Sequence, residues 1–294
     1  MSANSQPRTA LVTGASGGLG RRIVDQLVAA RWHVIAAVRS EQALSDLPRG
    51  SVTPVTLDVT DPDSVSGAVT EISPLIAEHG LNALVNNAGV IVQGPVELVR
   101  PEELRRQFEI NVVGQIAVTQ ALLPALRLAG GRVVNVGAIT ARVSVPFFGP
   151  VAASKAALAL LNDALRMELR YQGVRVSLVE PGALETAIFD KADQAAAEAG
   201  WRGGPEAESC YRQALADGRA AAAKQSRTPA DKAAATVVKA VTARRPATRY
   251  RVGSDARALA ILRRLPDRLR DSILMSSVGL KKSSFPSEAA LNSR

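Results

Sequence analysis

The chain has 294 residues, with 36 lysines and arginines against 27 acidic residues. Its single cysteine excludes an internal disulfide and a thiolate metal site, and its two histidines, His33 and His79, lie outside any metal-ligand spacing, so we expect no metal. No basic stretch is interleaved with aromatic residues, so we expect no nucleic-acid partner. The first residues lack the apolar run of a signal peptide and no stretch approaches a membrane span, so we expect a cytoplasmic protein.

The first elements predict a dinucleotide site. An apolar run at 9–13 ends in the glycine cluster GASGGLG at 14–20, and a helical pattern follows. This order predicts a phosphate cradle, because glycine lets the backbone approach a pyrophosphate and a helix N-terminus offers free N–H groups. A second apolar strand at 33–38 ends at Arg39, and an arginine there suits the 2′-phosphate of NADP, whereas an acidic residue suits NAD. The sequence therefore favours NADP(H) over NAD(H).

Strand and helix patterns alternate along the rest of the chain. We expect strands at 51–56, 81–85, 131–136, 174–179 and 250–252, and helices at 64–79, 101–128, 150–170 and from 229. Asp58 follows the third strand and is placed to accept a hydrogen bond from an adenine amino group, while Thr60 or Asp61 can cap the next helix. The motif NNAG at 86–89 ends the fourth strand, in the crevice where ligands bind in open α/β sheets.

Three further stretches have patterns that predict a local structure or role. Asn111 lies within a long helical pattern, where asparagine is a poor helix former, so we expect a kink or a buried hydrogen-bonding task. Residues 188–227 are alanine-rich and polar, typical of helical lid segments over a substrate cleft. Residues 256–274 are amphipathic and broken by Pro266; packing on the core or a subunit is favoured over packing on a membrane surface. We expect one domain at 1–255 and a C-terminal helical extension and tail at 256–294.

Taken together, the motifs resemble the short-chain dehydrogenase/reductase family. They are TGxxxGxG at 13–20, NNAG at 86–89, Asn111, Ser154-Lys155 and PGxxxT at 181–186, and the similarity is strong over residues 8 to 190. The resemblance implies an α/β fold with a doubly wound parallel sheet, the Rossmann fold, and a nicotinamide dinucleotide cofactor. It also implies a homodimer or homotetramer.

The resemblance assigns roles to particular residues. Asp58 is implied to hold the adenine, Asn87 and Gly89 the adenosine ribose region, Lys155 the nicotinamide ribose, and Thr186 the carboxamide. The implied pyrophosphate site is Gly14, Gly18 and Gly20. The whole implied cofactor site is Gly14, Ser16, Gly18, Leu19, Gly20, Arg39, Asp58, Val59, Asn87, Ala88, Gly89, Lys155, Pro181, Gly182 and Thr186.

The sequence departs from the family at two catalytic positions. The family carries Tyr-x-x-x-Lys, with a serine about a dozen residues before the tyrosine. With Lys155 as the lysine, Val151 stands at the tyrosine position and Ala138 at the serine position. The phenol exchanges a proton with the substrate oxygen and the serine hydroxyl steadies that oxygen, tasks that no aliphatic side chain performs. Lys155 and Asn111 are therefore the remaining catalytic candidates.

Three functions stay open at this point. The first is an NADPH-dependent reductase of a carbonyl, an imine or an activated double bond, with a proton route through Thr140, Ser144 or Lys155 and a water. The second is a non-redox cyclase, isomerase or dehydratase on the same scaffold. The third is a catalytically silent dinucleotide-binding sensor or partner subunit. We favour the first, because positioning a hydride donor against a substrate is by itself a large effect.

Overall fold

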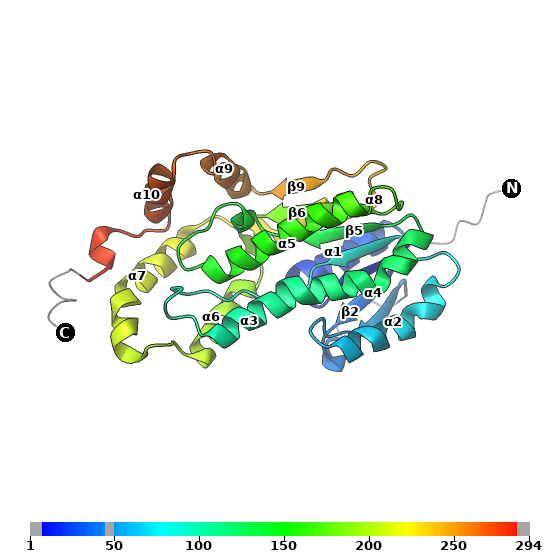
Figure 1. The fold of residues 1–294 in the computed structure, drawn as a ribbon, viewed down its shortest axis with the longest axis horizontal. Coiled ribbons are helices and arrows are strands. Elements are labelled where there is room, and N and C mark those ends of the chain that lie inside the picture. Colours follow the sequence, from blue (N-terminus) through cyan, green and yellow to red (C-terminus); the bar gives the residue numbers. More distant parts are fainter. Residues whose placement is uncertain (1–7, 45–49, 287–294) are drawn as a thin grey trace.

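The computed structural model describes residues 8–44 and 50–286. A seven-stranded parallel sheet with the order β3-β2-β1-β4-β5-β6-β9 forms its centre (Figure 1). The strands are β1 (Thr9–Thr13), β2 (His33–Val38), β3 (Val52–Thr56), β4 (Ala83–Asn86), β5 (Arg132–Val136), β6 (Arg175–Pro181) and β9 (Arg249–Val252). The strand order reverses between β1 and β4, which opens a crevice at their carboxyl ends. The predicted doubly wound α/β fold is confirmed.

Helices cover both faces of this sheet. The cluster on one face includes side chains of α1 and α8, and the cluster on the other face includes side chains of α2 and α4. The helices are α1 (Gly18–Ala29), α2 (Pro62–Ile76), α3 (Pro101–Phe108), α4 (Gly114–Leu128), α5 (Gly149–Glu168), α6 (Ile188–Ala199), α7 (Gly204–Lys224), α8 (Ala230–Thr242), α9 (Ser254–Leu262) and α10 (Asp267–Ser277). Short 3-10 turns lie at Glu41–Leu44, Ile139–Ala141 and Lys282–Ser284.

Coverage of both faces explains the apolar strands. In β2, Val34, Ala36 and Val38 face the α1 and α8 side, whereas Ile35 and Ala37 face the α2 and α4 side. Successive side chains of a strand point to opposite faces, so a strand that is buried on both sides reads as one continuous aliphatic run.

The long helical pattern at 101–128 is interrupted as expected. A π-helical turn, Glu109–Val113, joins α3 to α4 and carries the buried Asn111. A π turn of this kind often marks a functional site. The helix Pro101–Leu128 is the one helix among the described residues that is long and apolar enough to cross a membrane, contrary to our expectation that no stretch approaches a membrane span. Of its apolar window, 44% is buried, and α4 packs against α2.

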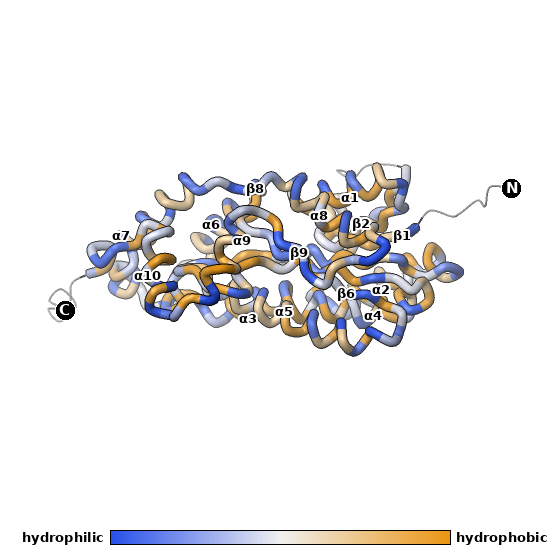
Figure 2. The backbone as a smooth tube through the Cα atoms, turned by 90° about the horizontal axis from the view of Figure 1, so that it is seen from above, coloured by the Kyte–Doolittle hydropathy of each residue, from blue (hydrophilic) through white to orange (hydrophobic). Residues whose placement is uncertain are grey.

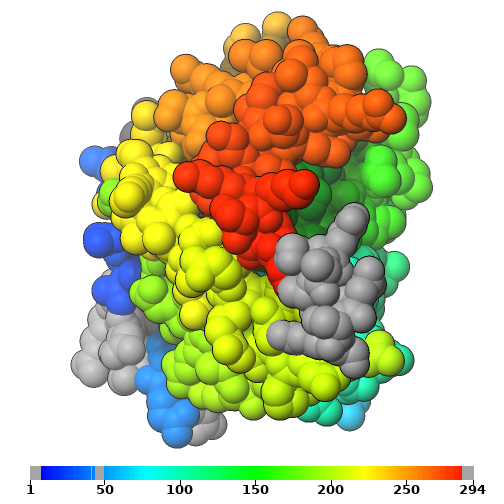
Figure 3. All heavy atoms as spheres, turned by 90° about the vertical axis from the view of Figure 1, so that its left-hand side faces the viewer, coloured from blue at the N-terminus to red at the C-terminus, as the bar shows by residue number. Residues whose placement is uncertain are grey.

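The segment at 188–227 is helical as expected and forms α6 and α7, which we call the lid. Together with the C-terminal segment they cover the end of the molecule shown in Figure 3. Gln93 Nε2 donates to Asp193 Oδ1 of α6 (2.7 Å), and the Tyr211 hydroxyl of α7 donates to Glu97 Oε2 (2.7 Å). A two-residue ladder, β7 (Leu184–Glu185) with β8 (Thr228–Pro229), closes the base of the lid and was not expected.

The C-terminal extension breaks at Pro266 as expected, into α9 and α10, which carry mixed hydrophobic and hydrophilic residues (Figure 2). Its last turn returns to the lid, where Ser284 Oγ donates to Asp217 Oδ2 of α7 (2.5 Å). Leu274, Leu280 and Ser284 are buried. The end of the extension therefore packs on the lid of the same chain.

Candidate functional site

The glycine cluster forms a tight turn between β1 and α1. Gly14 has φ +62°, and a Cβ there would lie 2.9 Å from the Ala88 Cα; a Cβ on Gly20 would lie 2.1 Å from the Gly14 carbonyl oxygen. Gly17 precedes α1 without any side-chain cap, and the first turn of the helix holds no acidic residue. Bare N–H groups at a helix N-terminus, reached over a floor without side chains, fit a pyrophosphate.

Two strands meet at this turn through Thr13. Its Oγ1 accepts hydrogen bonds from the backbone N–H groups of Asn87 (3.0 Å) and Ala88 (3.0 Å). The Asn87 amide donates to the carbonyls of Thr13 (3.0 Å) and Gly14 (3.2 Å). The carboxyl ends of β1 and β4 are thereby held together, and the NNAG motif forms the wall of the glycine turn.

Other predicted cofactor residues lie around the mouth of the turn. Ser16 and Gly18 are exposed there, and Leu19 is half-buried. A Cβ on Gly18 would lie 3.2 Å from the Thr186 side chain, so the glycine turn is adjacent to the residue that is predicted to bind the nicotinamide carboxamide.

Pro181 and Gly182 have a different neighbour. Pro181 ends β6 opposite Val252. A Cβ on Gly182 would lie 2.0 Å from a carboxylate oxygen of Asp255, which also accepts from the Ala183 N–H (2.8 Å). The glycine is thus required by close contact with the start of α9, a structural reason that the motif alone did not reveal.

Arg39 and Asp58 lie close together beyond β2 and β3. Burial tends to raise the pKa of Asp58, but hydrogen bonds from Thr60 and the charge of Arg39 outweigh it and lower that pKa. Thr60 N–H (2.9 Å) and Oγ1 (2.7 Å) both donate to Asp58 Oδ1, which leaves Oδ2 for a ligand such as adenine. Arg39 is exposed and has no carboxylate within ion-pair distance in the described part of the chain, as a 2′-phosphate site requires.

Two smaller expectations concern the same loop. Asp61 caps α2 by accepting from Asp63 N–H (2.9 Å), so the predicted cap is Asp61. Val59 is buried, and its carbonyl would lie 2.5 Å from a Cβ on Gly114, so α4 packs directly against the loop.

Lys155, Asn111 and Gly89 come together at the centre of the crevice. A Cβ on Gly89 would lie 3.1 Å from Asn111 Oδ1 and 3.7 Å from Lys155 Nζ. Asn111 Oδ1 accepts from Val90 N–H (2.9 Å) and Nδ2 donates to the Val90 carbonyl (3.0 Å), which confirms its predicted hydrogen-bonding task. Lys155 Nζ donates to the Val136 carbonyl (2.8 Å), and burial lowers the pKa of this ammonium to about 8.

The two substituted positions flank this cluster. Ala138 follows β5 in an extended conformation, and Val151 is 6% exposed on the first turn of α5, four residues before Lys155 and on the same helix face. Ser154 Oγ already has two hydrogen-bond partners, since it donates to the Val151 carbonyl (2.8 Å) and accepts from Asn111 (3.3 Å).

The two candidate hydroxyls of the loop, on Thr140 and Ser144, differ in exposure. Thr140 is half-buried and Ser144 is exposed, and neither is hydrogen-bonded to Lys155 in the part of the chain that the structure describes. The crevice therefore keeps a buried cation and an amide but offers aliphatic side chains where a phenol and a hydroxyl are expected.

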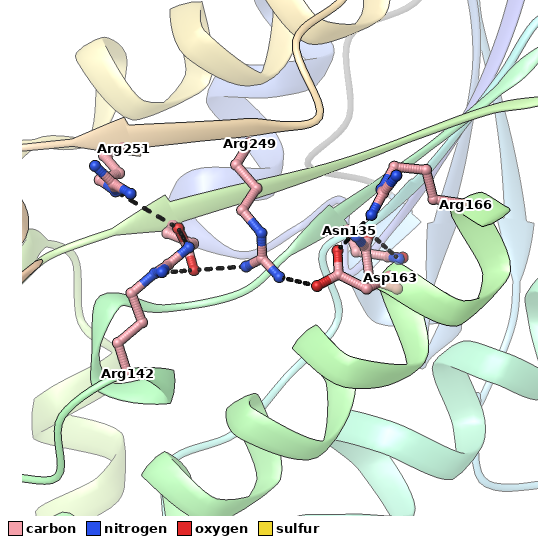
Figure 4. A network of polar contacts seen from close by, with 8 residues as sticks. Asn135, Arg142, Asp163, Arg166, Arg249 and Arg251 are labelled. Atoms are coloured by element: carbon pink, nitrogen blue, oxygen red, sulfur yellow. Dashed lines mark hydrogen bonds and ion pairs between the residues drawn. The ribbon is translucent and has the colours of Figure 1, made fainter.

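A buried ion-pair network behind the loop was not expected from the sequence. Arg142 donates to both oxygens of the fully buried Glu180 (2.8 and 3.0 Å), and Arg249 donates to Glu180 (3.0 Å) and to Asp163 (Figure 4). The network ties the segment after Ala138 to β6, β9 and α5. Its partners are 38 to 86 residues apart, so no local pattern announces it.

Two glutamines of the long helix were also missed. Gln107 accepts from Val92 N–H (2.6 Å) and donates to the Val90 carbonyl (2.8 Å), and Gln115 donates to the Ala88 carbonyl (2.8 Å). Both hold the segment that follows β4. For both glutamines, the sequence signal of such a role was a polar side chain on the buried face of an apolar helix.

Several known proteins are similar to this chain in sequence. A family model described as short chain dehydrogenase matches residues 8–197. The chain is 32% identical over 277 residues to an NADPH-dependent 3-dehydrocapnine reductase of Ornithobacterium rhinotracheale, covering 90% of this chain and 95% of that protein. It is 38% identical over 184 residues to a 3-amino-tetrahydro-pyrrolizinone reductase of Xenorhabdus hominickii, covering 63% of this chain and 64% of that relative, which is less than two thirds of its length.

Among solved structures, the fold is similar to that of a short chain dehydrogenase from Burkholderia cenocepacia J2315 in complex with NADP. The TM-score is 0.72 at 27% identity, over 92% of this chain and 98% of that one.

Proposed function

Because the chain belongs to the short chain dehydrogenase family, we propose that it is an NADP(H)-dependent oxidoreductase with a non-standard proton route. One observation carries the proposal: the glycine turn, Asn111 and Lys155 are intact and assembled, while Ala138 and Val151 leave the reacting position aliphatic. A chain that needed the scaffold alone has no evident use for a buried lysine at the centre of the crevice.

The choice of cofactor rests on Arg39. Its guanidinium is exposed beside Asp58 and has no carboxylate partner within ion-pair distance among the described residues, so it is available to a phosphate. The NADPH-dependent reductase and the NADP-bound neighbour named above support the same choice. When bound, the nicotinamide supplies a hydride; Gly14, Gly20, Asn87 and Lys155 are the residues that we expect to hold the dinucleotide.

The substrate class follows from the missing proton donors. Loss of a general acid lowers a rate by roughly 10²–10⁴-fold, and loss of an oxyanion donor by roughly 10²–10³-fold, so an ordinary ketone is a poor substrate here. An iminium ion already carries its proton, and a hydride added to its carbon leaves a neutral amine. The aliphatic wall of Val151 and Ala138 suits that reaction, because no alkoxide has to be protonated. A small imine is therefore favoured over a carbonyl or an activated double bond.

We also expect a homodimer or homotetramer that pairs through α4 and α5. On α5, Leu160 is 72% exposed and Leu161 is 41% exposed, and Val113, at the end of the π turn that leads into α4, is 52% exposed. Exposed large apolar side chains of this kind are candidates for an association surface. Light scattering with Leu160→Glu tests this expectation: the variant should be monomeric, and an unchanged mass contradicts the pairing.

The test of function separates binding from turnover. NADPH binding is measured by fluorescence, and NADPH consumption is then followed with matched panels of cyclic imines, ketones and quinones. We expect binding and consumption with imines, and gain of ketone reduction in the double variant Ala138→Ser with Val151→Tyr, with Ala138→Ser alone as the control. NADPH that binds but is never consumed with any substrate supports the silent partner and refutes the proposal.

A further inference from the structure

Much of the net positive charge of the chain, 8 − 2 = 6 of 9, lies at the end of the molecule opposite the candidate site. The described segments that precede β1, β2, β4 and β9, and those that precede β5 and β6 and include the first residue of each, are residue 8 and residues 30–32, 77–82, 127–132, 168–175 and 243–248. They carry eight arginines and two glutamates, whereas the other residues carry 28 of the 36 basic and 25 of the 27 acidic side chains. The eight are Arg8, Arg31, Arg127, Arg132, Arg170, Arg175, Arg244 and Arg245.

Topology brings these segments together. All strands of the large sheet are parallel, so the segments that precede them meet at one edge, which we call the basic end. Figures 1 and 2 show this edge on the side of the N-terminus, away from α7 and α10. Neighbouring strands lie about 4.8 Å apart, so the basic end is roughly 24 Å wide from β2 to β9. This width far exceeds a single phosphate and matches an extended array of anionic groups.

The arginines of the basic end are not neutralised by any carboxylate of the described residues. Seven are exposed and Arg132 is half-buried, and none of the eight forms an ion pair with a carboxylate in the part of the chain that the structure describes. Arg132 donates to the carbonyls of Ala240 (3.3 Å) and Ala243 (2.8 Å), and Arg175 to that of Arg244 (3.3 Å).

The like charges are also close enough to affect one another. Burial and the nearby charges of Arg175 and Arg8 lower the pKa of Arg132. Such repulsion opposes folding, and a partner that brings negative charge relieves it.

An exposed tyrosine and an exposed leucine accompany the arginines. Tyr171 is 89% exposed just beyond α5, and Leu128 is 61% exposed at the end of α4. The Arg170 guanidinium lies 5.4 Å from the centre of the Tyr171 ring. Tyrosine and arginine side chains, with an apolar body and a polar tip, are typical of the headgroup level of a bilayer.

We propose that the basic end docks on a membrane surface rich in anionic phospholipids. The headgroup phosphates and carboxylates face the arginines, and Tyr171 lies at the interface. In this orientation the lid and the carboxyl ends of the strands point away from the membrane, so docking leaves the crevice open to its ligands. Each arginine near such a surface contributes about fivefold to affinity.

Vesicle sedimentation with the full-length protein tests this docking. Vesicles are made of phosphatidylcholine with or without phosphatidylserine. We expect binding only when phosphatidylserine is present, and release at high salt, since ions screen exposed charges beyond a Debye length.

Two matched double variants locate the surface. Arg244→Ser with Arg245→Ser removes an exposed pair from the basic end, and Arg263→Ser with Arg264→Ser removes an exposed pair from the end of α9. Both change the net charge equally, and neither touches the candidate cofactor site. We expect the first to weaken vesicle binding by roughly 30-fold and the second by less than threefold.

Three results overturn the proposal. They are no preference for phosphatidylserine, equal losses in the two variants, and retention on heparin without vesicle binding, which assigns the basic end to a soluble polyanion. The readout needs neither NADPH nor turnover, so its failure is distinct from failure of the proposed enzyme function.

Discussion

Lys155→Met isolates the energetic consequence of keeping a buried cation in the crevice. The substitution keeps most of the side-chain stem and removes the charge. Burial lowers the pKa of Lys155 from 10.5 to about 8. At 1.36 kcal/mol for each unit of pKa, the charged lysine destabilises the unliganded fold by about 3 kcal/mol at neutral pH. The variant loses the hydrogen bond to the Val136 carbonyl, worth about 1 kcal/mol, so it should be about 2 kcal/mol more stable at pH 7.

The direction of the Lys155 pKa shift determines how the stability difference between the parent and the variant changes with pH. The folded pKa lies below the unfolded pKa, so between pH 8 and 10.5 the unfolded chain binds more protons than the folded chain. The parent protein should therefore gain stability relative to the variant as pH rises through this window. The advantage of Lys155→Met, about 2 kcal/mol at pH 7, should vanish at roughly pH 9.5, and the parent should be the more stable protein by about pH 10.5.

Urea unfolding of the two proteins at pH 7 and pH 10 measures this difference, with Lys239→Met, at an exposed lysine of α8, as the control. A variant less stable than the parent at pH 7, or a difference that does not change with pH, refutes the reasoning. The same variant should bind NADPH about tenfold more weakly, because one donor to the cofactor is lost.

Three further predictions address the cradle, the cofactor phosphate and the buried ion pairs. Gly20→Ala places a Cβ 2.1 Å from a backbone oxygen and should abolish NADPH binding. Gly67→Ala, with nothing within 4 Å, should leave NADPH binding unchanged and stabilise α2 by about 0.5–1 kcal/mol. Equal NADPH affinities of the two variants contradict the cradle. Arg39→Ser should weaken NADPH binding by about 10–100-fold and leave NADH binding unchanged in fluorescence titrations, and parallel losses exclude a phosphate contact. Arg142→Met should lower the free energy of unfolding by about 3 kcal/mol, whereas Arg105→Met, at a side chain 74% exposed, should change it by less than about 1 kcal/mol.

Much of the architecture was predictable because it depends on local patterns. Aliphatic runs of the length of β1 and β2 predict strands, and the glycine turn between β1 and α1 specifies where a phosphate can approach. Asn111 was also informative, because a poor helix former inside an apolar helix needs a reason. The structure supplies that reason as a π turn and two hydrogen bonds to Val90.

The remaining features depend on pairs of residues that are distant in sequence. Arg142 and Glu180 are separated by 38 residues, and Gly182 is explained by the carboxylate of Asp255. Neither relation has a period or a spacing that a sequence pattern can show. The basic end is similar, because its arginines are scattered along the chain and gather only when parallel strands place all their amino ends on one edge.

Deuteride transfer tests the central claim most directly, namely that a hydride is delivered across an aliphatic site. The protein is incubated with NADPH carrying deuterium at the reactive carbon and with a cyclic imine, and the amine product is analysed by mass spectrometry. We expect one deuterium in the new C–H bond of the amine, and no such product when Gly20→Ala prevents cofactor binding. An amine that is never labelled, although NADPH is bound, contradicts hydride delivery at this site.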